Sequence, residues 1–269
     1  VKKATFAQMD EEELRALIHD EAGKYLPFDD MAAVDYDFQI IGENPYNPSH
    51  MEVLIVASKK EIVEGYTEAI HAAGLIPVIM DVDSFALETM YEENYEFEEN
   101  DVAVLINIGA SITNLNAVKG GVSIFTRDFT LGGNSITEAL AANLGVSFEE
   151  AEKAKIEGTG DDEQARAAYR EGLIAYADPI CSEIERSVDY FRSTFGAENI
   201  SKVLLSGGGG MIPGMAADLG RRLGIETEMV NPFRKIPFDK KVLAPGAAER
   251  IGPIAAVGVG LALRKIGDQ

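Results

Sequence analysis

The chain has 269 residues, of which 46% are hydrophobic, and carries a formal net charge of −21 with a pI near 4.5. This length is enough for two modest domains with buried cores. Binding to nucleic acid phosphates or to anionic lipid needs clustered Lys and Arg, which so acidic a chain does not offer. The composition therefore predicts no nucleic-acid partner and no direct insertion into a membrane.

Cysteine and histidine usage argues against several kinds of site. The single cysteine, Cys181, allows no disulfide within the chain, and the apolar spacing around it predicts a small core residue on a helix. The three histidines, His19, His50 and His71, share no metal-ligand spacing. No signal peptide is recognisable, and the most apolar stretch, 253–263, is shorter than a membrane helix of about 20 residues. We expect a cytoplasmic protein.

The N-terminal third of the chain predicts alternating helices and strands. Asp10 and Glu13 have the spacing of a capping box, and Gly74 is suited to end a helix. The acidic run at 91–100 predicts a solvated linker between domains. The expected elements are a helix over 10–25, strands over 32–41 and 51–58 with a turn-rich loop between them, a helix over 59–74, a strand over 75–83 and a helix over 85–91.

The rest of the chain predicts a second α/β region. Residues 102–108 are apolar on both faces, as in a central strand. Ser147 and Glu150 form a further capping box, and Pro179 predicts a break between two helices. The expected elements are strands over 102–108, 112–118, 122–129, 202–206 and 225–230, and helices over 134–145, 148–158, 161–195 with its break, from 213, and from 253 to 265. Together the two regions predict an α/β protein with mixed sheets.

Two glycine-bearing turns indicate an anion site. "INIGAS" (106–111) joins two expected strands, and "SGGGG" (206–210) joins a strand to a helix. Glycine lets successive backbone amides point into one concavity, and a following helix adds its positive dipole end. Neither turn matches a P-loop or a dinucleotide fingerprint. Each alone could be an ordinary turn or a flexible loop, but the pair in one α/β region favours a phosphate ligand.

Four motifs carry a resemblance to a known family. "VLINIGASITNLNAV", "SIFTRDFTLGGNSITEAL", "FEEAEKAKIEG" and "KVLLSGGGGMIPGM" resemble successive motifs of the actin-like ATPase superfamily. Over essentially the whole chain the sequence is similar to the PilM family, cytoplasmic proteins of type IV pilus assembly related to FtsA. The resemblance implies an α/β, actin-like (ribonuclease H-like) fold with mixed sheets, two lobes and a small inserted FtsA-like subdomain.

The resemblance also implies a domain plan. Residues 1–80 would form the small inserted subdomain and return to the first lobe, and 81–100 would be a first-lobe segment and linker. Residues 101–269 would form the second lobe with the nucleotide-binding motifs. That lobe would contain an inserted helical subdomain at about 134–200 and a C-terminal helix that returns to the first lobe.

Members of this family imply a site for ATP and Mg²⁺. Asn107 would help to hold the Mg²⁺ ion. The implied nucleotide-binding residues are Asn107, Gly109, Ala110, Ser111 and Thr113 of the second phosphate loop, Gly132 and Gly133 at the next approach to the cleft, Glu152 and Lys155 as ribose and base contacts, and Gly207, Gly208, Gly209, Gly210 and Ile212 of the adenosine loop.

The sequence departs from the family pattern in two respects. The family opens with a strand and a "DIG"-type turn that forms the first phosphate loop, whereas this sequence opens inside the small subdomain. We therefore expect the full-length protein to extend further at the N-terminus, and this fragment to bind nucleotide weakly. Asn107 replaces a common aspartate, which keeps an oxygen ligand for Mg²⁺ but loses its charge. Hydrolysis is expected to be weak or absent, and no catalytic base is identified.

The resemblance implies a scaffold that binds the cytoplasmic N-terminal peptide of PilN through residues 10–80, with other pilus assembly proteins and motor ATPases as further partners. Such a protein would be cytoplasmic and peripheral to the inner membrane through its partner. One alternative is a small-molecule kinase or phosphatase of the same superfold, with Asp128 or Asp101 as its catalytic carboxylate. Another is an FtsA-like division protein, which would need an amphipathic membrane-binding helix beyond the last core helix.

Overall fold

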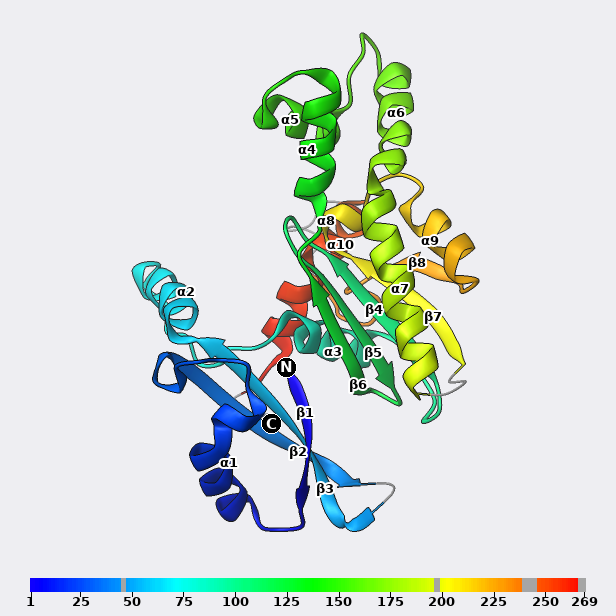
Figure 1. Cartoon of the computed structure of the whole chain (residues 1–269). Helices are drawn as coiled ribbons and strands as arrows, with labels where there is room; N and C mark the ends of the chain where they lie inside the picture. The colour runs from blue at the N-terminus through cyan, green and yellow to red at the C-terminus, as the bar shows by residue number, and fades with distance from the viewer. Residues whose placement is uncertain (45–46, 196–198, 239–245, 266–269) are drawn as a thin grey trace. The chain divides into compact units, whose positions relative to one another are not determined.

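The computed structural model describes residues 1–44, 47–195, 199–238 and 246–265. They form two compact units, Val1–Met80 with Lys265 and Asp81–Arg264 (Figure 1). The finer division into lobes and inserted subdomains stays a prediction.

The first unit is an antiparallel sheet, with strand order β1-β3-β2, that is covered by a helix. Side chains alternate along β3, so Met51, Val53 and Ile55 are buried on one face and meet Leu14 and Ile18 of α1. One of the two bonds of the predicted capping box is confirmed, since the Glu13 amide donates to Asp10 Oδ1 at 2.8 Å. The elements are β1 (Lys2–Ala7), α1 (Glu11–Tyr25), a 3₁₀ turn (Met31–Ala33), β2 (Val34–Asn44), β3 (Asn47–Lys59) and α2 (Lys60–Ala72).

Two predictions for this unit are wrong. Strands β2 and β3 extend into the expected loop at 42–50, of which 45–46 lie outside the described residues. The strand expected over 75–83 does not form: this stretch is without regular structure until α3 begins at Asp83, and Leu75, Ile76 and Val78 are exposed. An apolar run becomes a strand only where a neighbour satisfies its backbone groups, and no described strand pairs with it.

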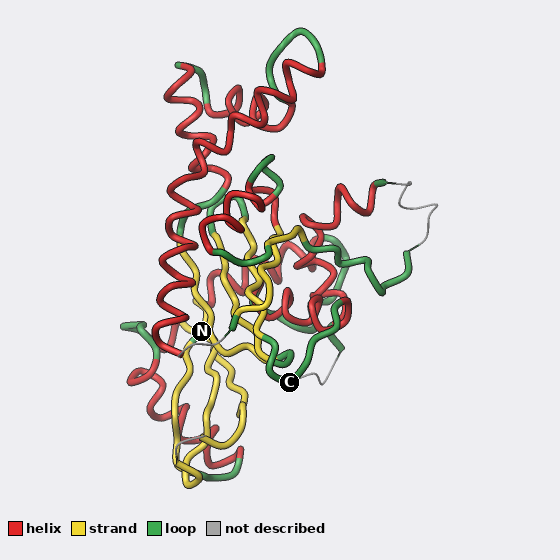
Figure 2. Tube along the Cα trace, turned by 90° about the vertical axis from the view of Figure 1, so that its right-hand side faces the viewer, coloured by secondary structure: helices red, strands yellow, loops and turns green. Residues whose placement is uncertain are grey.

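The second unit is a five-stranded mixed sheet, with order β6-β5-β4-β7-β8, that has helices on both faces (Figure 2). β4, β5 and β6 pair antiparallel, whereas β7 is parallel to both β4 and β8. This confirms the predicted mixed sheet. The elements are α3 (Asp83–Asn94), β4 (Val102–Ile108), β5 (Thr113–Lys119), β6 (Val122–Phe129), α4 (Gly133–Leu144), α5 (Phe148–Glu157), α6 (Glu163–Gly172), a 3₁₀ turn (Leu173–Ala177), α7 (Asp178–Phe195), β7 (Ile200–Ser206), α8 (Gly207–Gly210), α9 (Met215–Leu223), β8 (Thr227–Met229) and α10 (Ala247–Leu263).

Strand β4 lies at the centre of this sheet and is buried on both faces, as its continuous apolar run predicts. Val104 and Ile106 pack in a core with residues of α4, α7 and α9. Ala103 and Leu105 pack on the other face with residues of α3 and α10. Helices α4, α5 and α6 extend beyond one end of the strands (Figure 1).

The acidic run 91–100 is not a solvated linker. Helix α3 continues to Asn94, and Tyr91, Asn94 and Tyr95 are buried. The rings of Tyr91 and Tyr95 stack with their centroids 5.4 Å apart, and the Asn231 amide donates to the Tyr95 hydroxyl at 2.8 Å. The exposed positions of the run are Glu92, Glu93, Glu96 and 98–100, so its tyrosines and Asn94 belong to the core of the second unit while its acidic side chains face solvent.

Of the two prolines predicted to mark helix boundaries, Pro179 lies near one and Pro253 does not. The break near Pro179 is confirmed, because the 3₁₀ turn Leu173–Ala177 separates α6 from α7. The last helix, by contrast, starts at Ala247, and Pro253 lies inside it. Pro253 lacks an amide donor, but Gly252 and Pro253 are themselves buried, and this packing offsets the missing hydrogen bond.

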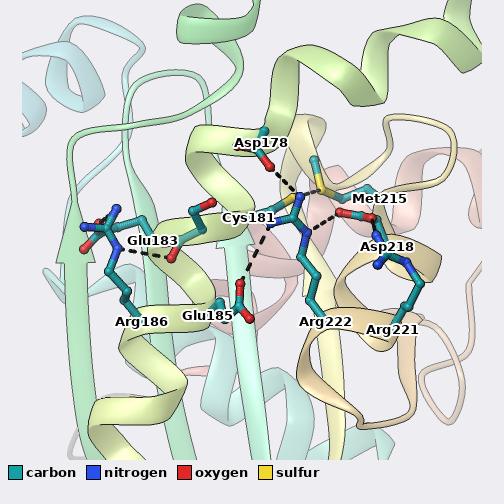
Figure 3. A network of polar contacts seen from close by, with 10 residues as sticks. Asp178, Cys181, Glu183, Glu185, Arg186, Met215, Asp218, Arg221 and Arg222 are labelled. Atoms are coloured by element: carbon teal, nitrogen blue, oxygen red, sulfur yellow. Dashed lines mark hydrogen bonds and ion pairs between the residues drawn. The ribbon is translucent and has the colours of Figure 1, made fainter.

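Helices α7 and α9 are joined by charged side chains around one arginine (Figure 3). Arg222 of α9 pairs with Asp178 of α7 and, at 2.7 Å, with Asp218 of its own helix. Beneath it the Cys181 thiol lies 3.6 Å from the sulfur of Met215. Burial raises the pKa of Cys181 to about 11, so the thiol stays protonated. The prediction of a core cysteine is confirmed.

Glu88 should make the stability of the second unit depend on pH. It accepts from Asn116 Nδ2 at 3.2 Å and from the Ser123 amide at 3.0 Å, but burial outweighs these bonds and raises its pKa to about 7. The folded state therefore holds a proton that the unfolded state releases, and the free energy of unfolding falls as pH rises from 5.5 to 8.

We expect Glu88→Gln to remove about 2 kcal/mol of that fall, since glutamine stays neutral throughout. Urea unfolding of parent and variant at pH 5.5 and 8 measures it. An equal fall in both proteins would show that Glu88 titrates normally.

Candidate functional site

The predicted phosphate turn joins β4 to β5 and is bonded to the start of α4. The carbonyls of Gly109 and Ala110 accept from the amides of Gly133 and Asn134 at 2.9 and 2.7 Å. Gly132 must be glycine, because a Cβ there would lie 2.6 Å from the Gly109 oxygen. The first amides of α4 therefore hold the turn in place, and Ala110 and Ser111 at its tip are exposed.

Four polar side chains on adjacent strands form a row, which we call the polar ladder. Ser206 Oγ donates to Asn107 Oδ1 at 3.2 Å, and Asn107 Nδ2 donates to Asn114 Oδ1 at 3.2 Å. Asn114 Nδ2 donates in turn to Asp128 Oδ1 at 2.9 Å. The register pairs Asn107 with both Ser206 and Asn114, and Asn114 with Asp128. The ladder therefore crosses β7, β4, β5 and β6.

The predicted ribose and base contacts lie on α5 and are tied to the start of α4. Lys155 Nζ donates to the Gly133 carbonyl at 2.9 Å and to Thr137 Oγ1 at 2.7 Å, and pairs with Glu152 at 2.7 Å. Thr137 also hydrogen-bonds Glu152. Burial alone would raise the pKa of Glu152, but the bonds from Lys155 and Thr137 outweigh it and hold the pKa below its ordinary value. Glu152 is therefore an anion at neutral pH.

The four consecutive glycines form the short helix α8 at the end of β7, and they do not share one role. Gly207 has φ +81°, and a Cβ there would lie 2.3 Å from the Ile108 carbonyl oxygen. A Cβ on Gly209 would lie 2.4 Å from the Ile108 side chain. Both are glycines because α8 packs directly on the end of β4. Gly208 is exposed and a Cβ there would meet nothing within 4 Å, so the fold itself does not require glycine at this position.

The structure brings most of the predicted site residues together in the second unit. The turn 109–111, Gly132, Gly133 and the α5 pair meet at the start of α4, and α8 meets Asn107 and Ile108. Two residues are placed differently. Thr113 is buried and donates to the Leu131 carbonyl at 2.8 Å, and Ile212 packs in the core. Their side chains support the turn and α8.

Sequence reasoning missed three residues of this region, Asn114, Thr137 and Ser206. Thr137 follows Gly133 by one helical turn, a spacing that places both on the same side of a helix. Asn114 and Ser206 had no signal of their own, because their role depends on which strands are neighbours. Of the two carboxylates considered for catalysis, Asp101 precedes β4 and accepts from the Glu98 amide at 3.0 Å, at the opposite end of the strand from Asn107.

No group of three or more His, Cys, Asp or Glu side chains in the described part of the chain is arranged to hold a metal ion. Among the same residues, no helix is long and apolar enough to cross a membrane.

Comparison with known proteins agrees with this architecture. The family model for type IV pilus assembly protein PilM matches residues 2–266. The structure superposes on a PilM–PilN type IV pilus biogenesis complex with a TM-score of 0.84 and 28% identity, covering 99% of this chain and 76% of that one. The structure also superposes on MreB5 of Spiroplasma citri bound to AMPPNP with a TM-score of 0.50 and 12% sequence identity, covering 77% of this chain and 65% of that one. This second match is a likeness of fold.

A shorter match is 31% identical over 116 residues to the ethanolamine utilization protein EutJ of Escherichia coli (strain K12). It covers 43% of this chain, and the matched part spans only 37% of that relative. The mixed sheet, its two helical layers and these neighbours define an actin-like ATPase fold. Within that class, the chain belongs to the PilM family of type IV pilus assembly proteins.

Proposed function

We propose that this protein is an actin-like scaffold of type IV pilus assembly that binds ATP with Mg²⁺ and holds the N-terminal peptide of PilN. The nucleotide part rests on one observation above all. Gly208 is an exposed, open glycine between two glycines that pack on Ile108, the residue directly before the phosphate turn. A ligand that lies against the backbone explains why no side chain stands there.

The residues present fit such a ligand. The adenosine would lie over α8 at Gly208, and Glu152 can accept from ribose hydroxyls while Lys155 supplies a positive charge. Exposed backbone at Ala110 and Ser111 would meet the phosphates. Asn107 offers an oxygen of the kind that Mg²⁺ takes, although without charge. We expect hydrolysis to be slow or absent. Because the sequence predicts weak nucleotide binding, calorimetric titration with ATP and Mg²⁺ up to millimolar concentrations tests this part, and absence of binding over that range would refute it.

The peptide part rests on family membership and on the likeness to a PilM–PilN complex. The first unit offers a groove of about 490 Å³ between α1 and β2. Arg15 lies over the Phe38 ring at 4.8 Å, and His19 and Tyr36 are hydrogen-bonded at 3.0 Å. An aromatic floor with charged walls suits a short peptide with apolar and charged residues. Binding PilN would place the protein at the inner membrane.

We expect a peptide from the cytoplasmic N-terminus of PilN to bind with micromolar affinity, and Ala16→Arg to weaken it at least about tenfold by filling the groove. Ala16 is exposed on α1, so its replacement should cost little stability. Ala69→Arg, an exposed position on α2, is the matched control. Calorimetry measures all three proteins. Unchanged affinity in Ala16→Arg would exclude this groove, and no binding to the parent would contradict the PilN assignment for this chain.

A further inference from the structure

The polar ladder has a direction, and one of its members sets it. Asp128 carries a carboxylate, which can only accept hydrogen bonds when ionised. Asn114 must therefore turn its NH₂ group toward Asp128, as the 2.9 Å contact shows, and its carbonyl oxygen toward Asn107. Asn107 must then turn its own NH₂ group toward Asn114. Its oxygen is left on the other side, where the Ser206 hydroxyl donates to it.

The direction matters because of where the Asn107 oxygen lies. A Cβ on Gly207 would be 2.8 Å from this oxygen, so it lies at the junction of β4 and α8, inside the cluster proposed to hold nucleotide. An amide that is free to flip would present NH₂ to the same place in part of the molecules, and NH₂ cannot coordinate a cation. Asn114, through which the effect must pass, is only 8% exposed, so solvent has little access to its amide group.

We propose that Asp128 is a positioning residue: through Asn114 it fixes the amide of Asn107 so that an oxygen, and not an NH₂ group, faces the nucleotide-bound cation. The effect on the cation rests on the proposed function, whereas the direction of the ladder rests only on its hydrogen bonds. Asp128 is exposed at the outer end of the ladder, on edge strand β6, and would act across two strands without touching the ligand.

Exchanging the residue types at positions 107 and 128, which flank Asn114 in the ladder, tests the direction. Asp128→Asn removes the acceptor-only end, so either direction is allowed. Asn107→Asp puts a carboxylate at each end of a single amide, which can donate to only one of them. In the double variant N107D/D128N, Asn114 can donate to residue 107 and accept from residue 128, so the ladder runs in reverse with every partner satisfied.

The first measurement is urea unfolding of parent, both single variants and the double variant without nucleotide. We expect Asn107→Asp to raise the unfolding equilibrium constant about tenfold, and the double variant to return within about twofold of the parent. Single effects that simply multiply in the double variant would overturn the proposed direction. If Asp128 only filled space or faced solvent, the double variant would not regain the stability that Asn107→Asp loses.

The second measurement is calorimetric affinity for ATP with and without Mg²⁺. We expect Asp128→Asn to weaken binding of the Mg²⁺ complex about twofold, because about half of the molecules would then present NH₂ to the cation, and to leave Mg²⁺-free ATP unchanged. The double variant should bind the complex at least as well as the parent. Equal weakening with and without Mg²⁺ would overturn the positioning role. If the parent binds no ATP, the proposed function fails, and the unfolding cycle still decides whether Asp128 directs the ladder.

Discussion

Gly208→Val should weaken ATP binding at least about tenfold and leave the fold intact. A Cβ at this exposed position meets no neighbouring atom within 4 Å in the folded protein, so there is room to add a side chain. The two methyl groups of valine would enter the volume that we assign to the adenosine. The loss of affinity would then come from the ligand alone, which separates a binding role from a structural one.

Two control variants separate an effect on ATP binding from an effect on stability. Gly207→Val should destabilise the protein by about 2 kcal/mol or more, because it combines positive φ with a Cβ 2.3 Å from the Ile108 oxygen. Gly65→Val, on α2 with nothing within 4 Å, makes the same change at an open helical glycine of the other unit and should leave ATP affinity unchanged. Calorimetry gives the affinities and urea unfolding the stabilities. Parent-like affinity in Gly208→Val would remove α8 from the site.

Local chemistry could be predicted from the sequence where one segment decides the outcome. The capping box at Ser147 and Glu150 forms with both of its reciprocal bonds, because all of its atoms lie within one turn of chain. Strand β4 matches its expected bounds, since a short run that is apolar on both sides is stable only at the centre of a covered sheet. The sequence predicts a loop at the four glycines, whereas they form the short helix α8. Their division into packing and open positions depends on the contact with Ile108.

The rest depended on contacts between distant segments. Residues 75–80 have strand-like composition yet remain unpaired among the described residues, because composition cannot supply a neighbouring strand. The run around Tyr91 is acidic in composition, but its aromatic side chains have the spacing of a buried face. Tyr91 and Tyr95 therefore pack in the core, although the composition of the run predicts a solvated segment. The polar ladder needs the register of four strands, so Asp128 could be judged only as an isolated carboxylate at a strand end.

Gly260→Ala should lower the free energy of unfolding of the second unit by about 3 kcal/mol or more. Gly260 lies where α10 crosses α3, and a Cβ there would be 1.7 Å from the Ala86 carbonyl oxygen. Neither atom can yield by a side-chain rotation, because one belongs to the backbone and the other is the first atom of the side chain. The helices would have to separate, and Leu87, Met90 and Ala256 would lose packing in the core beneath them.

Gly258→Ala is the matched control on the same helix, since a Cβ there meets nothing within 4 Å. It should be neutral or stabilise the protein by about 0.5–1 kcal/mol, as expected for alanine in place of glycine inside a helix. Urea unfolding followed by circular dichroism gives the stabilities, and amide hydrogen exchange in α3 locates the change. Helices α3 and α10 cover the face of the sheet opposite α7 and α9. The loss of packing between α3 and α10 should therefore affect the candidate nucleotide site only through strands β4 and β7. Equal stability of Gly260→Ala and Gly258→Ala would show that α10 does not approach α3 as closely as this packing requires.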